Sequence, residues 1–443
     1  MDYNKLYAQE AQLLDRFFVN KKPKSLPYSV ERFGATRLVR VNPKYVCYPI
    51  DVPLGVSLAD LKRIQADIER IIFNNRSKHG ITDEVKVLIQ EQPSQIVVAR
   101  VDPLTLTYAS RPRDGKPRFV LLGKSFVGGK SQPEVINLNH PDTCHVLVGG
   151  KTGCGKSRML YQMILSACEH SEPTDLQIAL VDIGGKALSA FSKLPHCAAY
   201  VTELAETKAL LAHFEKQLVG AQDTYTTRTM IVIDEAPALT STGDKETDTE
   251  FARLLKVLAE RGRAYGISLV LGAQNPPDSS GPVEVRRNLG VRVAGMCSES
   301  AMSEIILDKG NREAADLTLQ GTFIVRHSGQ SRLTFSYYLT DDEMINEIAR
   351  LKSEYDPCTQ IDLLVGDGDG DVMLPQVAIN AAVDVLKQYT NDDGTLETGY
   401  VMPTKRAIAD ALGRKSITGN AADKFDRFLD FVVSIYKSGN LVL

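Results

Sequence analysis

A glycine-rich segment at residues 145–157 places the strongest constraint on what this chain can fold into. It reads His-Val-Leu-Val-Gly-Gly-Lys-Thr-Gly-Cys-Gly-Lys-Ser, and positions 150–157 match the pattern G-x-x-x-x-G-K-S. A short apolar run precedes the glycines, and apolar residues recur at helical spacing after them, at Met159, Leu160 and Met163. Strand, glycine-rich turn and helix, in this order, are the context of a P-loop. The segment therefore predicts a phosphate-binding site within an α/β fold.

The residue types of this segment suit a nucleotide. Glycines let successive backbone N–H groups face phosphate oxygens, and the N-terminus of the following helix adds partial positive charge. Lys156 is expected to reach the β- and γ-phosphates, and Ser157 to bind Mg²⁺. ATP and Mg²⁺ are therefore the expected cofactors. The predicted nucleotide-binding residues are Gly150, Lys151, Thr152, Gly153, Cys154, Gly155, Lys156, Ser157 and Arg158.

Two carboxylates at the end of a later apolar run complete this chemistry. Residues 230–235 read Met-Ile-Val-Ile-Asp-Glu, the Walker B pattern of a buried strand that ends in acidic residues. Asp234 is expected to hold Mg²⁺ through water, because Mg²⁺ prefers hard oxygen ligands. Glu235 is expected to orient and deprotonate the attacking water. Paired with the P-loop, this pattern predicts an ATP hydrolase.

Polar residues in other parts of the chain are further candidates for this site. Gln274 ends the next apolar run, where its amide would sense the γ-phosphate or position water; solvation of a strand end is the alternative. Arg261 and Arg263 lie near the end of a helix predicted over 251–265. A guanidinium keeps its charge and forks onto phosphate oxygens, so it suits a role at a neighbouring subunit's ATP. The alternative is ordinary complementation of the helix macrodipole.

The bulk composition limits how this chain can bind nucleic acid. Lys and Arg total 52 and Asp and Glu total 55, which gives a net charge of −3. Any DNA contact must therefore be local, such as the lining of a channel. The 7 cysteines form no C-x-x-C pair, which fits a reducing compartment. No apolar run approaches the ~20 residues of a membrane span, and no signal peptide opens the chain. We therefore expect a soluble, cytoplasmic protein without a membrane segment.

The order of predicted elements divides the chain into several parts. Residues 1–28 contain an N-terminal helix, and residues 29–118 mix strands and a helix in a small α/β domain. From 119 to 355, buried strands alternate with helices, which predicts a mostly parallel sheet with helices on both faces. Residues 356–375 are interpreted as an acidic, glycine-rich linker. Residues 376–443 are interpreted as a helical or winged-helix C-terminal domain, with a cap for docking a protein partner as the alternative.

A series of segments occurs in an order shared with one known family. These segments are residues 121–124, 145–157, 181–186, 194–196, 231–235, 258–267, 272–276 and 321–325. By these segments the chain resembles the FtsK/SpoIIIE group of DNA translocases, within the wider FtsK–HerA family. The resemblance is good over residues 119–340 and looser over residues 30–118. A single-motor chain of this size resembles the plasmid, phage or mobile-element members.

The resemblance implies a RecA-like motor domain that assembles as a hexameric ring around double-stranded DNA. It implies that Lys156, Ser157, Asp234 and Glu235 have the roles derived above. It also implies that Gln274 is the sensor and that Arg263 is the arginine that acts in trans.

The family resemblance further places two predicted loops, at 239–249 and 275–288, at the DNA pore. Lys245 in the first loop, and Arg286 and Arg287 in the second, are therefore candidate DNA contacts, with solvated surface charge as the alternative. Two other functions remain open. One is a related motor that moves protein substrates, and the other is a P-loop ATPase that acts as a switch without translocation.

Overall fold

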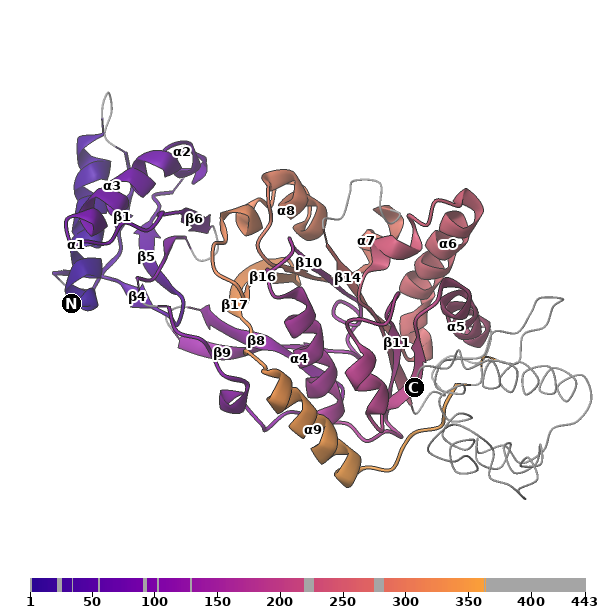
Figure 1. Cartoon of the computed structure of the whole chain (residues 1–443). Helices are drawn as coiled ribbons and strands as arrows, with labels where there is room; N and C mark the ends of the chain where they lie inside the picture. Colours follow the sequence, from indigo (N-terminus) through magenta and orange to yellow (C-terminus); the bar gives the residue numbers. More distant parts are fainter. Residues whose placement is uncertain are drawn as a thin grey trace, which may run out of the picture.

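The chain folds into an N-terminal α/β domain and a larger α/β domain that contains the glycine-rich segment (Figure 1). Most of the predicted linker, and all of the predicted C-terminal domain at 376–443, lie outside the described residues. Within the described part of the chain, no helix combines the length and the apolar character that crossing a membrane requires. The computed structural model describes residues 2–21, 26–33, 35–54, 56–90, 94–101, 103–127, 130–218, 227–274, 283–361 and 363.

The N-terminal domain packs helices against a small sheet. Helix α1 begins after Asp2, whose side chain caps it by accepting a hydrogen bond from the Lys5 N–H at 3.2 Å. The helix predicted in this domain is divided into α2 and α3, since the backbone at Ile64 leaves the helical conformation (φ −106°, ψ 14°). The sheet order is β1-β5-β7-β6, with β4 beside β5, while β2 pairs with β3. The elements are α1 (Tyr3–Asn20), β1 (Ser29–Val30), β2 (Arg32–Phe33), β3 (Thr36–Arg37), β4 (Arg40–Val41), β5 (Tyr45–Asp51), α2 (Ala59–Arg63), α3 (Gln65–Ser77), β6 (Val87–Gln90) and β7 (Gln95–Ala99).

Both faces of this small sheet are covered. On β5, Val46, Tyr48 and Ile50 belong to the core that the sheet forms with α1 and α3. The intervening residues, Tyr45 and Cys47, belong to the core of the larger domain. Successive side chains of a strand point to opposite faces, so the far face of the sheet packs against the larger domain. An apolar interface therefore joins the two domains.

The larger domain is built on a 10-stranded sheet with the order β12-β11-β13-β14-β10-β15-β16-β17-β8-β9. Neighbouring strands are parallel from β12 to β15 and antiparallel from β15 to β9. Within the antiparallel half, β16 and β17 form a tight hairpin, and Ser328 and Gly329 in its turn both have positive φ (49° and 74°). The strands are β8 (Phe119–Val127), β9 (Lys130–Asn137), β10 (Val146–Gly149), β11 (Leu176–Val181), β12 (Cys197–Val201), β13 (Arg228–Ile233), β14 (Ile267–Ala273), β15 (Val291–Ala294), β16 (Thr322–His327) and β17 (Gln330–Phe335).

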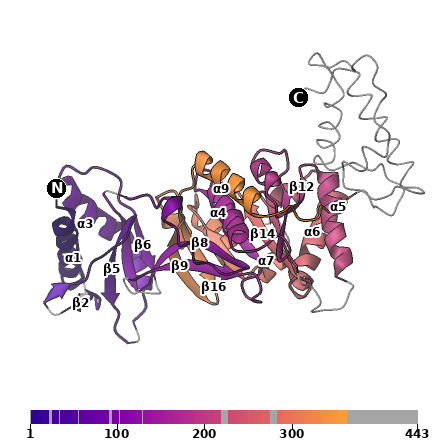
Figure 2. The ribbon, with the colours of Figure 1, turned by 90° about the horizontal axis from the view of Figure 1, so that it is seen from below.

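Helices cover both faces of this sheet, as predicted (Figure 1). Val146 and Val148 of β10 share a core with Met159 and Met163 of α4, whereas Leu147 belongs to the core on the other face, with α5 and α6. Figure 2 shows the N-terminal domain beside β8 and β9 at one end of the sheet, and α5 and α6 toward the other end. The helices are α4 (Lys156–Glu169), α5 (Leu204–Gln217), α6 (Lys245–Arg261), α7 (Val283–Asn288), α8 (Ser300–Leu307) and α9 (Asp341–Glu354).

The structure corrects two loop predictions. The polar segment predicted as a mobile loop up to residue 249 is already helical from Lys245, the first residue of α6. Asp244 caps this helix, since its side chain accepts a hydrogen bond from the Thr247 N–H at 3.0 Å. The second predicted loop, 275–288, ends in the short helix α7, and its residues 275–282 lie outside the described residues. Polar composition alone did not reveal the capping residue.

Candidate functional site

The glycine-rich segment forms a loop between the end of β10 and the start of α4. Gly150 (φ 152°) and Gly155 (φ 105°) adopt backbone conformations that other residues rarely adopt. A Cβ atom at Gly150 would lie 2.7 Å from the Cys154 sulfur. The loop is held from both ends, because the Lys151 N–H donates to the Met296 oxygen at 2.8 Å and the Gly321 N–H donates to the Cys154 oxygen at 3.0 Å. The predicted P-loop geometry is therefore anchored by strands on the β15–β16 side.

Cys154 has a packing role in this loop. Its side chain is fully buried, and burial raises the pKa of its thiol. A protonated, inaccessible thiol is a poor nucleophile, so we assign it no chemistry.

Lys156 joins the P-loop to the predicted Walker B carboxylates. Its ammonium lies 3.1 Å from Asp234 Oδ1 and 3.3 Å from Glu235 Oε2, and it also donates to the main-chain oxygen of Asp234. These residues meet because β10, β14 and β13 are parallel neighbours, so their carboxyl ends lie at one edge of the sheet. The lysine side chain is only 3% exposed. The buried cation can bind phosphate oxygens, and the carboxylates can bind a divalent metal ion.

Glu235 is positioned by the strand that follows it in the chain. The Gln274 N–H, at the end of β14, donates to both carboxylate oxygens of Glu235, at 2.9 and 3.0 Å. The two strand ends approach closely, since a Cβ atom at Gly272 would lie 2.0 Å from the Asp234 oxygen. Burial raises the pKa of Glu235, which brings this carboxylate closer to the pKa that suits a base at neutral pH.

The side chain of Gln274 also contacts the P-loop. Its amide oxygen accepts a hydrogen bond from the Thr152 hydroxyl at 3.3 Å. One residue thus touches Glu235 through its main chain and the P-loop through its side chain. The predicted sensor position of Gln274 is consistent with this geometry, and its sensing role stays a prediction.

The oxygen donors near Lys156 fit a magnesium ion that is shared with a phosphate. Ser157 lies in the first turn of α4, next to Lys156, which contacts Asp234. Within the described ranges, no group of three or more His, Cys, Asp or Glu side chains could hold a metal ion alone. Mg²⁺ bound through one carboxylate, a hydroxyl and substrate phosphates needs no such cage. Ser157 and Asp234 therefore remain the candidate metal ligands.

The candidate arginine Arg263 lies at the opposite edge of the sheet. It is exposed and belongs to the 3₁₀ helix η4 (Gly262–Tyr265), directly before the amino end of β14. His145 directly precedes β10, and burial, Arg228 and Arg263 lower the pKa of its imidazole to about 4. The charge of Arg263 therefore lies close to the start of β10. Arg263 is therefore remote from the Lys156 of its own chain. Arg261, by contrast, donates to the Leu218 oxygen at 3.0 Å.

The three candidate DNA contacts differ in their surroundings. Arg286 is half-buried and donates to the Ile305 oxygen of α8 at 3.2 Å, so it holds two helices together. Its neighbour Arg287 is exposed on α7. Lys245 is exposed at the start of α6. Arg287 is thus a better candidate for a surface contact than Arg286.

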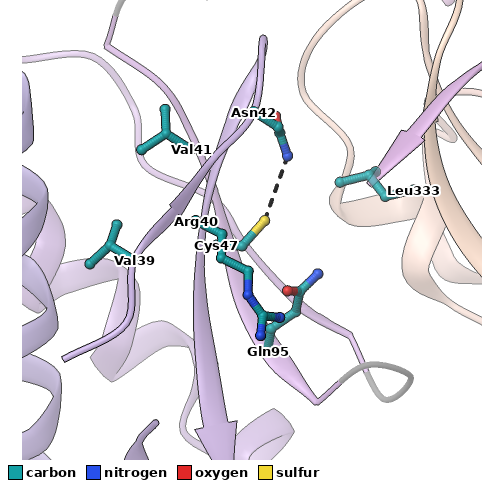
Figure 3. A pocket seen from close by; sticks show the side chains of 7 residues that line it. All are labelled: Val39, Arg40, Val41, Asn42, Cys47, Gln95 and Leu333. Carbon is teal, nitrogen blue, oxygen red and sulfur yellow. Dashed lines mark hydrogen bonds between the residues drawn. The ribbon is translucent and has the colours of Figure 1, made fainter. Parts of the chain in front are cut away.

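Two pockets lie outside the Lys156 cluster. A pocket of about 380 Å³ lies beside the P-loop, and Arg158 and Lys44 are among the residues that line it. Another, of about 260 Å³, lies between the N-terminal domain and β17 (Figure 3). In that pocket Asn42 donates to the Cys47 sulfur at 3.6 Å, and burial raises the pKa of Cys47 to about 12. A thiol in this state offers no nucleophile.

Comparison with known proteins identifies a family for the central part of the chain. Residues 108–275 match the model of the FtsK/SpoIIIE family. The chain is 26% identical over 350 residues to the DNA translocase FtsK of Treponema pallidum (strain Nichols), covering 71% of this chain and 42% of that protein. It is 25% identical over 357 residues to the DNA translocase FtsK of Haemophilus influenzae, covering 70% of this chain and 65% of that protein. The chain thus corresponds to a part of each relative.

A solved structure shows the same fold. The pCW3 conjugation coupling protein TcpA, in its monomer form with ATPγS, aligns with a TM-score of 0.50 and 19% sequence identity. The alignment covers 80% of this chain and 100% of that chain. This likeness confirms the predicted α/β fold. The match of residues 108–275 to the family model confirms the resemblance to the FtsK/SpoIIIE family.

Proposed function

The chain carries an FtsK/SpoIIIE family domain, and from this premise we propose that it is an ATP hydrolase that drives the translocation of double-stranded DNA. The contact of Lys156 with both Asp234 and Glu235, at the carboxyl ends of parallel strands, carries the proposal for hydrolysis. The names of the curated relatives support DNA as the substrate. All 7 cysteines are free thiols, which fits a cytoplasmic protein.

Each residue of the cluster has a defined role in hydrolysis. The backbone N–H groups of the loop and the Lys156 ammonium bind the β- and γ-phosphates. Ser157 and Asp234 would hold Mg²⁺, which would neutralise phosphate charge when bound with ATP. Glu235 accepts a proton from the attacking water while the Gln274 N–H fixes the orientation of its carboxylate.

We further propose a ring of subunits, six in number by family resemblance, in which Arg263 acts on the neighbouring ATP. Because Arg263 lies at the opposite sheet edge from Lys156, a head-to-tail contact between two copies would bring these residues together. Heterologous contacts of this kind generate a ring where the rotation between copies closes. The guanidinium would then neutralise charge that develops on the phosphates during transfer.

Mixing two inactive variants tests this role of Arg263. Arg263→Ala and Lys156→Ala are each expected to lower ATP turnover by roughly a thousandfold. An equal mixture should recover measurable turnover, because some interfaces then pair an intact P-loop with an intact arginine. A mixture of Lys156→Ala with Glu235→Gln serves as the control. Both changes damage the ATP site of the chain that carries them, so this mixture should not recover turnover. Absence of recovery, in a mixture shown by native mass spectrometry to co-assemble, would contradict a trans role.

DNA stimulation of hydrolysis tests the motor function and the candidate DNA path together. Wild-type turnover should rise when long duplex DNA is added, whereas a protein-moving motor or a switch should not respond. Arg287→Ala should reduce this stimulation and flatten the salt dependence of DNA binding by up to about 0.9 log unit, the value for one phosphate contact. Basal turnover should remain unchanged, because Arg287 is exposed and outside the Lys156 cluster.

The matched control for this experiment is Lys352→Ala. It removes one exposed positive charge from α9, on the other face of the sheet. Full DNA stimulation in Arg287→Ala would show that the DNA path lies elsewhere. Arg286→Ala is unsuitable for this purpose, because loss of its bond to the Ile305 oxygen would disturb the packing of α8.

A further inference from the structure

A pocket lies beside the P-loop, on the side of β10 away from the Walker B carboxylates. Asp234 and Gln274 follow β13 and β14, on one side of β10, whereas the pocket is lined by residues that flank β16 and β17, on the other side. Arg158 also lines it, and positions two apart on a helix point roughly 200° away from each other. Lys156 therefore faces the carboxylates and Arg158 faces the pocket. A nucleotide with its γ-phosphate toward Glu235 would direct its sugar and base to this pocket.

The N-terminal domain contributes Lys44 to this pocket. The lysine directly precedes β5, is 8% exposed, and donates to the main-chain oxygen of Gln320. A Cβ atom at Gly321 would lie 3.1 Å from the Lys44 nitrogen. The N–H of the same glycine donates to the Cys154 oxygen in the P-loop at 3.0 Å. Gly321 thus contacts both Lys44 of the N-terminal domain and the P-loop of the larger domain.

The charge of Lys44 is poorly compensated. Over the ranges that the structure describes, no carboxylate forms an ion pair with it, and its hydrogen-bond acceptor is the neutral carbonyl of Gln320. Burial lowers the pKa of Lys44 to about 8. Burying a cation without a counter-charge is unfavourable, and an ammonium has three N–H donors. An acceptor in the pocket would use the remaining donors, which a purely structural lysine would leave without a use.

Contacts around the pocket hold the N-terminal domain in place. The Tyr45 hydroxyl accepts hydrogen bonds from the N–H groups of Thr318 and Leu319, at 3.4 and 3.3 Å. The Gln65 amide donates to Asp316 at 3.2 Å. These bonds fix the segment that leads into Gln320 and Gly321. The lysine therefore reaches the pocket from a defined position.

We propose that Lys44 donates hydrogen bonds to the sugar or base of bound ATP, so that the N-terminal domain forms part of the nucleotide site. This role rests on the ATP-binding function proposed above. The pocket volume of about 380 Å³ lies in the range of small-molecule sites. A ligand that contacts both domains stabilises the arrangement in which they are docked. Nucleotide occupancy would thus be coupled to the position of the N-terminal domain.

Comparing a nucleotide with a bare polyphosphate tests the proposal. Calorimetric titration with Mg-ATPγS and with Mg-tripolyphosphate is carried out on the wild-type chain and on Lys44→Met, which keeps the length and apolar stem of the side chain. The variant should lose roughly ten- to a hundredfold in affinity for ATPγS, the loss of charged hydrogen bonds. Its affinity for tripolyphosphate should be unchanged, because the phosphates contact the P-loop. Lys5→Met, an exposed lysine of α1, is the matched control.

The outcomes separate this inference from the proposed function. If the wild-type chain binds neither ligand, the ATP-binding function itself is wrong. If the wild type binds both and Lys44→Met binds ATPγS equally well, or loses both ligands equally, the nucleoside contact is wrong. Hydrogen exchange on the wild-type chain gives a test that needs no variant. ATPγS, but not tripolyphosphate, should slow exchange in the pocket-lining segment 103–105, and equal protection by both ligands would overturn the proposal.

Discussion

Lys156→Ala is expected to lower ATP turnover by at least about a thousandfold, which corresponds to about 4 kcal/mol of transition-state stabilisation. The Lys156 side chain is 3% exposed, and its ammonium lies within 3.3 Å of both Walker B carboxylates. Its removal takes away the charge that binds the β- and γ-phosphates and leaves Asp234 and Glu235 facing each other without a cation. ATP binding, measured by calorimetry, should weaken together with turnover.

The control for this variant is Lys151→Ala in the same loop. The Lys151 side chain is exposed, and the residue is held through its main-chain N–H, which donates to the Met296 oxygen. This variant should retain turnover within a few-fold of the wild type. Turnover by Lys156→Ala at the wild-type rate would show that the P-loop assignment is wrong.

Glu235→Gln should bind ATP normally and hydrolyse it roughly a hundred- to ten-thousandfold more slowly, the usual contribution of a general base. The amide cannot take a proton from water, but its oxygen can still accept the hydrogen bond from the Gln274 N–H. Single-turnover hydrolysis and equilibrium binding distinguish these effects. Because the variant retains ATP, we also expect it to assemble into the proposed ring, which sizing in the presence of ATP would show.

The matching control is Gln274→Ala. It removes the amide that contacts Thr152 but keeps the N–H that orients Glu235, so a smaller loss of turnover is expected. Fast hydrolysis by Glu235→Gln would move the role of base to another residue.

The parts of the site that could be predicted are those that depend on short, continuous segments of the sequence. The glycine spacing specifies the P-loop, and the apolar run before Asp234 and Glu235 specifies a buried strand. Because these strands are parallel, the loop and the two carboxylates lie at the same edge of the sheet. The double hydrogen bond from the Gln274 N–H to Glu235 could not be predicted, because it depends on the close approach at Gly272. The contribution of Lys44 depends on how the domains pack, which no periodicity reveals.

Other features of the fold could not be predicted for similar reasons. Segment 341–354 received no helix prediction, although Thr340 and Glu343 form a capping box at its start. The sequence predicts a loop at Lys245 because the first turn of α6 is polar, as is typical of an exposed helix start. Arg286 and Arg287 were paired as DNA contacts because they are adjacent, but adjacent residues on a helix face different directions. Only the structure shows that Arg286 holds α8.

The covered far face of the small N-terminal sheet limits how this chain can be divided or recombined. Tyr45, Cys47, Leu88 and Val97 belong to the same apolar core as strands of the larger domain. A gene fusion that exchanged the first 118 residues for another module would expose that core to water, unless the new module presented an apolar surface of matching shape. This domain can therefore be exchanged only for a module with a matching apolar surface, or together with the surface against which it packs.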